Sequence, residues 1–125
     1  MTPAVRQTVE DFKLFCRLND GLIMGEVAPL KSDPHCIVIQ IYDVKPRGGP
    51  SSLEYHVKIC ALEPNDDEDN GHYLVAVYCD GRQVEYVSCT EENVSNRTRS
   101  LTGSIISEKS KRRIECTVPK PKKRK

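Results

Sequence analysis

The dipeptide Asp80-Gly81 lies between two runs rich in β-branched and aromatic residues, 72–79 (HYLVAVYC) and 82–89 (RQVEYVSC). A two-residue type I′ turn needs positive φ at both central positions, and Asp-Gly adopts this conformation readily. The pattern therefore predicts an antiparallel hairpin. The expected register pairs apolar residues across the two strands: Val77 with Val84, and Val75 with Tyr86.

Three further segments are expected to join the same sheet. Residues 53–62 alternate between apolar and polar side chains, which is typical of an antiparallel strand with one solvent-facing side. Residues 36–44 (CIVIQIYDV) are apolar on both sides, so both faces of this strand are expected to be partly buried. A short strand over 22–27 is weakened by Gly25. We therefore expect an antiparallel sheet of three to five strands.

Helical spacing of apolar residues appears at both ends of this β-rich region. Residues 8–18 are predicted to form an N-terminal helix, with Thr8 as its N-cap and Asn19-Asp20-Gly21 as its stop. Residues 91–106 are predicted to form a second helix, because apolar side chains and a threonine recur at helical spacing along them. The expected fold class is α+β, with both helices on one face of the sheet.

The charge is unevenly distributed, although the net charge of the 125 residues is only +1. Residues 107–125 contain nine Lys/Arg and two acids, a net charge of +7, whereas residues 1–106 contain ten bases and sixteen acids, a net charge of −6. Apolar periodicity also stops near residue 107. We therefore expect a compact domain over 1–106 and a disordered basic tail over 107–125.

The end of this tail, Pro119–Lys125, has the sequence PKPKKRK. It resembles a monopartite nuclear localisation signal, the kind of peptide that importin-α reads. The resemblance implies an importin-type receptor as a partner and a nuclear as well as cytoplasmic localisation. The candidate residues form this run and a second basic patch upstream of it: Lys120, Lys122, Lys123, Arg124 and Lys125, with Lys111, Arg112 and Arg113.

The same cations would also attract RNA or DNA, since phosphate contacts need no particular fold and are weakly sequence-specific. The first functional hypothesis is therefore a small binding module whose tail mediates nuclear import, nucleic-acid contact or both. The alternative is an adaptor or inhibitor whose acidic body, with Glu54, Glu85 and the loop 63–71, engages a partner protein while the tail serves transport alone. The tail could also fold back on that acidic body.

Other functional classes receive no support from the residues. The sequence contains no HExxH, G-x-S-x-G or Gly-rich phosphate loop, so we expect neither an enzyme nor a cofactor. An EF-hand reading of the loop 63–71 fails because Val77 stands where a bidentate Glu is needed. An RNA-recognition-motif reading fails because His72 and Leu74 occupy the expected stacking positions. No apolar run has the length of a membrane span, and no secretory signal is evident.

The six cysteines have no C-x-x-C spacing. In a chain without a secretory signal, we expect reduced structural thiols rather than a disulfide framework or a metal site. Disulfide pairing and metal ligation remain as alternatives at this point.

Overall fold

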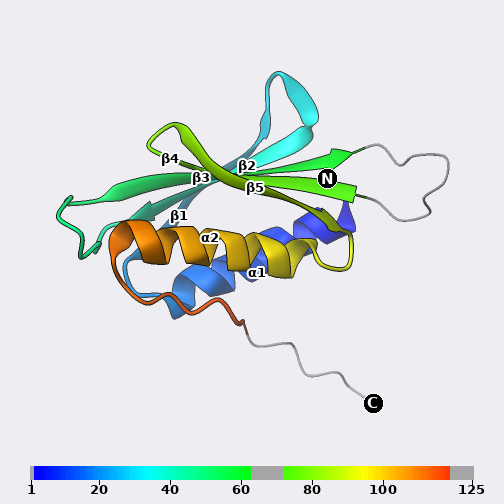
Figure 1. Cartoon of the computed structure of the whole chain (residues 1–125). Coiled ribbons are helices and arrows are strands. Elements are labelled where there is room, and N and C mark those ends of the chain that lie inside the picture. The colour runs from blue at the N-terminus through cyan, green and yellow to red at the C-terminus, as the bar shows by residue number, and fades with distance from the viewer. Residues whose placement is uncertain (1, 63–71, 119–125) are drawn as a thin grey trace, which may run out of the picture.

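The computed structural model describes residues 2–62 and 72–118, and these form one antiparallel sheet with two helices packed on one of its faces (Figure 1). The elements follow one another along the chain: α1 (Pro3–Leu18), β1 (Leu22–Leu30), β2 (Asp33–Asp43), β3 (Leu53–Leu62), β4 (His72–Cys79), β5 (Arg82–Thr90) and α2 (Val94–Ser110). The strand order is β1-β2-β3-β4-β5, so each strand pairs with its neighbours in sequence. The predicted α+β class is confirmed.

The core lies between the sheet and the helix pair. Alternate residues of the three central strands point toward the helices, as the period of two along a strand requires. Large side chains from both layers are fully buried there, each stabilising the fold by about 1.5–3 kcal/mol: Phe12, Phe15, Ile39, Ile41, Tyr55, Val57, Val75 and Val77. The opposite face of the sheet is covered by no element among the described residues (Figure 1). We call it the open face.

The predicted turn between β4 and β5 is confirmed, with φ of 49° at Asp80 and 83° at Gly81. The predicted register is wrong, because a β-bulge between Val77 and Tyr78 shifts the pairing by one residue. Val77 lies opposite Glu85, and Val75 lies opposite Val87. A bulge adds one residue to one strand and so reverses which side chains face the core. The shift places Val87 and Cys89 toward the helices and Tyr86 on the open face.

Helix α1 begins earlier than the predicted start at Thr8. Its N-cap is Thr2, whose hydroxyl accepts a hydrogen bond from the Val5 amide at 3.2 Å, and Pro3 opens the first turn. Proline suits this position because its missing N–H would have had no partner in the helix. Thr8 lies inside the helix, fully buried, and its hydroxyl donates to the Ala4 carbonyl at 2.7 Å.

Strand β1 is also longer than the predicted segment 22–27. The side chains of Gln40 and Tyr42 lie across Gly25: a Cβ there would approach the Gln40 Oε1 to 2.6 Å and Tyr42 Cε2 to 3.2 Å. The glycine therefore provides space for a neighbouring strand's side chains, and its lack of a side chain does not end the strand.

The C-terminal part of the chain is more ordered than its composition predicts. Helix α2 starts at Val94, three residues after the predicted start, and continues to Ser110 rather than ending at 106. Residues 111–118 then pack against the helices, and Val118 is 9% exposed. The prediction of a disordered tail from residue 107 is wrong for residues 107–118. Residues 119–125 and the acidic loop 63–71 lie outside the described residues.

Contacts made by Asn19 and at Gly103 explain why the segment 111–118 packs against the helices. The Asn19 side-chain amide donates to the Glu115 carbonyl at 2.8 Å and accepts from the Glu115 amide at 2.7 Å, pairing with this segment as a strand would. Gly103 leaves space on α2 for Cys116, whose sulfur occupies the position that a Cβ would take. Hydropathy patterns do not reveal such contacts, because a single amide and a single glycine supply them.

Cys36 and Cys60 form a disulfide between β2 and β3. The prediction of reduced thiols is therefore wrong for this pair. The two residues are direct cross-strand partners on the open face, an arrangement that depends on the register of β2 on β3. Cys16, Cys79, Cys89 and Cys116 are free thiols.

Candidate nucleic-acid interface

The predicted basic patch Lys111, Arg112 and Arg113 divides into two roles. Arg112 turns inward: its Nε and Nη2 donate to the two carboxylate oxygens of Asp43, each at 3.2 Å. Asp43 is fully buried and the Arg112 side chain is 12% exposed. Arg112 is therefore engaged inside the protein, while Lys111 and Arg113 on either side of it are exposed.

The electrostatics of Asp43 follow from its partners. Burial opposes ionisation, but hydrogen bonds from Arg112, Ser110 and the Lys45 amide outweigh it, so the pKa of Asp43 lies below its usual value. Ser110 is in turn bonded to the buried Tyr55 hydroxyl at 3.0 Å. Burial raises the pKa of Tyr55 to about 12. The end of α2 is thus fixed to β2 and β3 by a connected set of buried polar groups.

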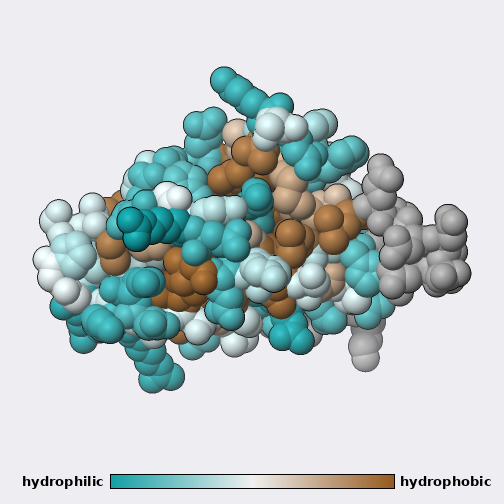
Figure 2. All heavy atoms as spheres, turned by 45° about the horizontal axis from the view of Figure 1, so that its top comes forward, coloured by the Kyte–Doolittle hydropathy of each residue, from teal (hydrophilic) through white to brown (hydrophobic). Residues whose placement is uncertain are grey.

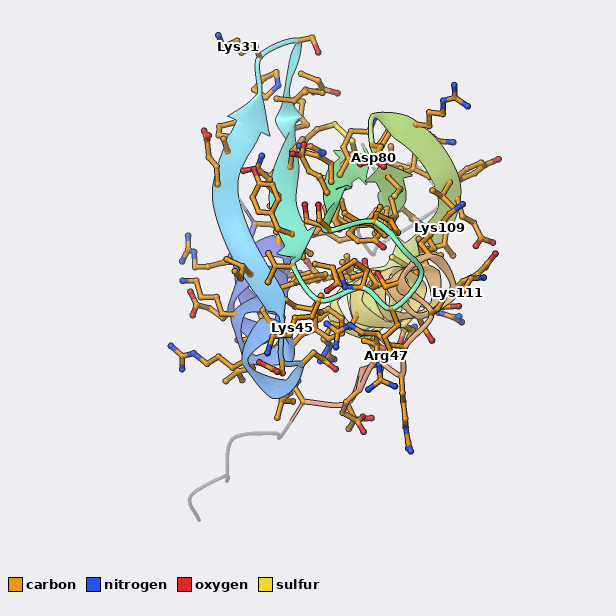
Figure 3. The ribbon with its side chains drawn as sticks, turned by 90° about the vertical axis from the view of Figure 1, so that its left-hand side faces the viewer. Lys31, Lys45, Arg47, Asp80, Lys109 and Lys111 are labelled. Atoms are coloured by element: carbon orange, nitrogen blue, oxygen red, sulfur yellow. A yellow bond between two sulfur atoms is a disulfide. The ribbon has the colours of Figure 1, made fainter. Side chains whose placement is uncertain are left out.

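Exposed cations from two distant parts of the chain meet beside this anchor. The connection between β2 and β3 pairs with the end of α2 through the Arg47 amide, which donates to the Ser110 carbonyl at 2.7 Å. Gly48 lies so close that a Cβ there would be 3.1 Å from Lys111 Cγ. Figure 3 shows the cations of both segments at the same end of the molecule. We call this set the basic end: Lys45, Arg47, Lys109, Lys111 and Arg113.

One cation of the basic end, Lys45, is paired with a surface carboxylate. Lys45 forms an ion pair with Asp20 at 2.7 Å, but the two side chains are 61% and 84% exposed, and such surface pairs are worth about 0–1 kcal/mol. The hydrogen bond from Lys45 lowers the pKa of Asp20. Asp20 and Asp43 each have a basic partner, and the other four cations of the basic end are exposed, as are Glu108 and Glu115 beside them in the chain.

A groove of about 670 Å³ opens beside the basic end, between the β4–β5 turn and the β2–β3 connection. Its lining includes Lys109 and Arg82 and one carboxylate, Asp80. A phosphate-bearing chain placed in this groove would meet two cations and one carboxylate. The groove extends the basic end toward the edge strand β5.

The sequence identified only part of this surface. Lys111 and Arg113 belong to it, Arg112 does not, and Lys120, Lys122, Lys123, Arg124 and Lys125 lie outside the described residues. Sequence reasoning missed Lys45, Arg47 and Lys109. The first two lie in a turn-rich stretch sixty or more residues before residue 107, where the tail was predicted to begin, and no local pattern connects them to it.

The free thiols lack the features of an activated nucleophile. Burial raises the pKa of Cys16 to about 12 and also raises the pKa values of Cys79, Cys89 and Cys116. A nucleophilic cysteine needs the opposite shift. Within the described ranges, no group of three or more His, Cys, Asp or Glu side chains is placed to hold a metal ion.

Neither helix, α1 nor α2, has the length and hydropathy of a membrane span. Comparisons with protein-family models, curated proteins and solved structures give no significant match.

Proposed function

We propose that this protein is a non-enzymatic nucleic-acid-binding module in which the basic end and the C-terminal run 119–125 contact phosphates together. The observation that supports the proposal is the gathering of exposed cations from the β2–β3 connection and the end of α2 (Figure 3). The buried ion pair of Arg112 with Asp43 holds these two segments together, so the cations are presented on a rigid support.

The distribution of acids is compatible with this proposal. Five of the sixteen acids among residues 1–106 fall in 63–71. That loop follows Leu62 and precedes His72, which lie at the end of their strands opposite to Leu53 and Cys79. Leu53 and Cys79 line the groove beside the basic end. The ends of β3 and β4 that carry the acidic loop are thus the ends remote from the cations.

The test compares two full-length variants with equal charge change. The first replaces four cations of the basic end by glutamine: Lys45, Arg47, Lys109 and Lys111. The control replaces four exposed cations elsewhere: Arg6, Arg17, Lys31 and Arg97. Removing one phosphate contact reduces the salt dependence of binding to a single strand by about 0.7 in log–log slope. We expect the slope measured by fluorescence anisotropy to fall by about 3 in the first variant and by less than 1 in the control. Equal reductions would show that only net charge matters, and would overturn the role of the basic end.

We further propose that the run 119–125 is read by an importin-type receptor, giving a nuclear as well as cytoplasmic distribution. The support is its resemblance to a monopartite localisation signal. The test is a fusion to a carrier too large to diffuse through the nuclear pore, with Lys122, Lys123, Arg124 and Lys125 replaced by alanine. We expect loss of nuclear accumulation in this variant and normal accumulation with Lys45→Gln/Lys109→Gln. Nuclear accumulation of the alanine variant would contradict the proposal.

The second candidate function is a protein-binding adaptor, with the tail used for transport alone. It is favoured by apolar side chains at the surface of the sheet, such as Ile23, which is 51% exposed. Of the acids predicted to contact such a partner, Glu85 is exposed, while Glu54 is half-buried and lies 3.4 Å from His56. A full chain that binds no nucleic acid near physiological salt would make this the leading function.

A further inference from the structure

Two tyrosines on neighbouring strands, Tyr78 of β4 and Tyr86 of β5, lie in adjacent rows of the open face. Opposite residues in antiparallel strands point to the same side, so two rows of side chains can be read directly from the register. One row consists of Val38, Lys58, Ala76 and Tyr86. The row beside it consists of Gln40, His56, Tyr78 and Gln83.

The two tyrosines differ in how they are held. Tyr86 is 61% exposed, the largest exposed fraction among the large apolar and aromatic side chains of the described residues. Tyr78 is half-buried: Lys58 Nζ lies 5.6 Å from its ring centroid, and its hydroxyl donates to Gln83 Oε1 at 3.3 Å. Ala76, which lies opposite Tyr86, is 2% exposed. The result is one fixed ring beside one accessible ring.

The two rows that carry these rings are polar and contain no carboxylate; one carboxylate, Glu54, lies opposite Tyr42 in the next row, 3.4 Å from His56. The two rows contain one ammonium group, one imidazole and two side-chain amides. Figure 2 shows apolar surface over the sheet interrupted by hydrophilic side chains. An apolar helix docking here would remove water from the Lys58 ammonium and from the side-chain amide N–H donors of Gln40 and Gln83, at a cost of about 1–3 kcal/mol for each group left unpaired. A ligand that is flat, aromatic and edged with hydrogen-bonding groups would leave none of them unpaired.

This face is continuous with the basic end. Gln83 follows Arg82 in the chain, and both line the groove that also contains Lys109. A path therefore runs from Tyr86 and Tyr78 through Gln83 and Arg82 to Lys109. The two tyrosine rings lie at one end of this path, and the cations Arg82 and Lys109 lie at the other.

We propose that the ligand of this module is a single-stranded nucleic acid, RNA or DNA, whose bases stack on Tyr86 and Tyr78 while its backbone continues along the groove to the basic end. The proposal rests on the proposed nucleic-acid function and names its substrate class. Bases in a duplex are stacked on each other and unavailable to a side-chain ring, so only a single strand gains from this face. Amides and imidazole in the same rows can reach base edges, and Lys58 can meet a phosphate.

The test measures binding of the full chain to an oligonucleotide of about 12 nucleotides, as single-stranded RNA, single-stranded DNA and the matched duplex, by fluorescence anisotropy over a range of salt. The variants are Tyr86→Leu, which removes the aromatic ring, and Tyr86→Phe, which keeps it. Leu18→Ala serves as a control, because Leu18 is 45% exposed on α1, away from the sheet. Thermal unfolding checks that each variant is folded.

For Tyr86→Leu we expect single-strand affinity to fall by roughly 5- to 150-fold, the range for loss of one base–aromatic stack. Its salt slope and its affinity for duplex should stay unchanged, since no phosphate contact is removed. Tyr86→Phe and Leu18→Ala should remain within about 2-fold of the original chain.

Two results would overturn the stacking proposal while leaving the phosphate-binding function in place. One is that Tyr86→Leu leaves the affinity for a single strand unchanged. The other is that it lowers the affinities for single strand and duplex equally. Failure of the original chain to bind any nucleic acid would instead refute the function itself. A second measurement uses the absence of tryptophan from the chain. In Tyr86→Trp, saturation with a single strand should quench the tryptophan fluorescence and saturation with duplex should not. Equal fluorescence in both would also overturn the proposal.

Discussion

Replacing Arg112 by glutamine tests whether this cation is part of the fold rather than of the binding surface. The substitution removes both hydrogen bonds to Asp43 and leaves its carboxylate fully buried without its cationic partner. Breaking a buried ion pair from one side costs about 3–5 kcal/mol. Because the Arg112 side chain is 12% exposed and water can reach part of its position, we expect a loss near the lower value, about 3 kcal/mol.

The assay is thermal unfolding followed by circular dichroism. A loss of about 3 kcal/mol lowers Tm by about 10 °C in a chain of this size. The matched control is Arg113→Gln, the same change at the adjacent exposed residue, for which we expect less than about 0.5 kcal/mol. Equal unfolding temperatures for the two variants would refute the structural role of Arg112.

The pH dependence of the stability lost in Arg112→Gln independently tests the role of the ion pair with Asp43. In the original chain the pKa of Asp43 is lowered, so its contribution to stability is present above the ordinary value of 3.8 and disappears as the pH falls through the lowered pKa. In Arg112→Gln the hydrogen bonds and the charge of Arg112 no longer lower the pKa of Asp43, so the carboxyl takes up a proton at higher pH than in the original chain. The stability difference between the two chains should therefore shrink between neutral pH and about pH 4. A difference that stays constant with pH would contradict this reasoning.

Three further predictions concern the segment 111–118 and the buried thiols. Asn19→Ala removes both hydrogen bonds to Glu115 and should lower the free energy of unfolding in urea by about 2 kcal/mol; a change below about 0.5 kcal/mol would show that the segment is held elsewhere. Gly103→Ala places a methyl group where the Cys116 sulfur lies, so it should destabilise the fold by about 1–3 kcal/mol, although alanine favours a helix, and Cys116→Ala should rescue it; an additive double variant would argue against the contact. Cys16 is 8% exposed with a pKa of about 12, so at pH 8 iodoacetamide should modify it, as followed by mass spectrometry, only as fast as the chain unfolds; rapid modification in the folded protein would contradict its burial.

The strands could be predicted because their signals are local. The alternation over 53–62 gives β3 its observed bounds, and Asp80-Gly81 fixes the turn by its own φ preferences. Features that depend on a distant partner could not be predicted. The bulge that turns Tyr86 to the open face and the pairing of Cys36 with Cys60 both arise from register, which the hydropathy of a single strand does not determine.

The candidate site, like the fold, was predictable only where its residues are close together in the sequence. The basic run near the C-terminus is evident from the sequence, since it is continuous. The contribution of Lys45 and Arg47 is not, because it requires the β2–β3 connection to lie against the end of α2. The prediction that Arg112 belongs to the binding surface could not be avoided from the sequence, because an arginine that pairs with a buried carboxylate cannot be distinguished there from one that faces solvent.

The salt dependence of single-strand binding by the full chain tests most directly whether the folded body takes part. The run 119–125 contains five cations and the basic end contains five more. With a slope of about −0.7 for each phosphate contact, the run alone gives at most about −3.5, and both together give at most about −7. We predict that the log of the binding constant falls with the log of the salt concentration with a slope steeper than about −3.5. When the basic end is neutralised, the slope should return to about −3.5. A slope of about −3.5 or shallower, unchanged by that neutralisation, would show that the C-terminal run acts alone and would contradict the proposed interface.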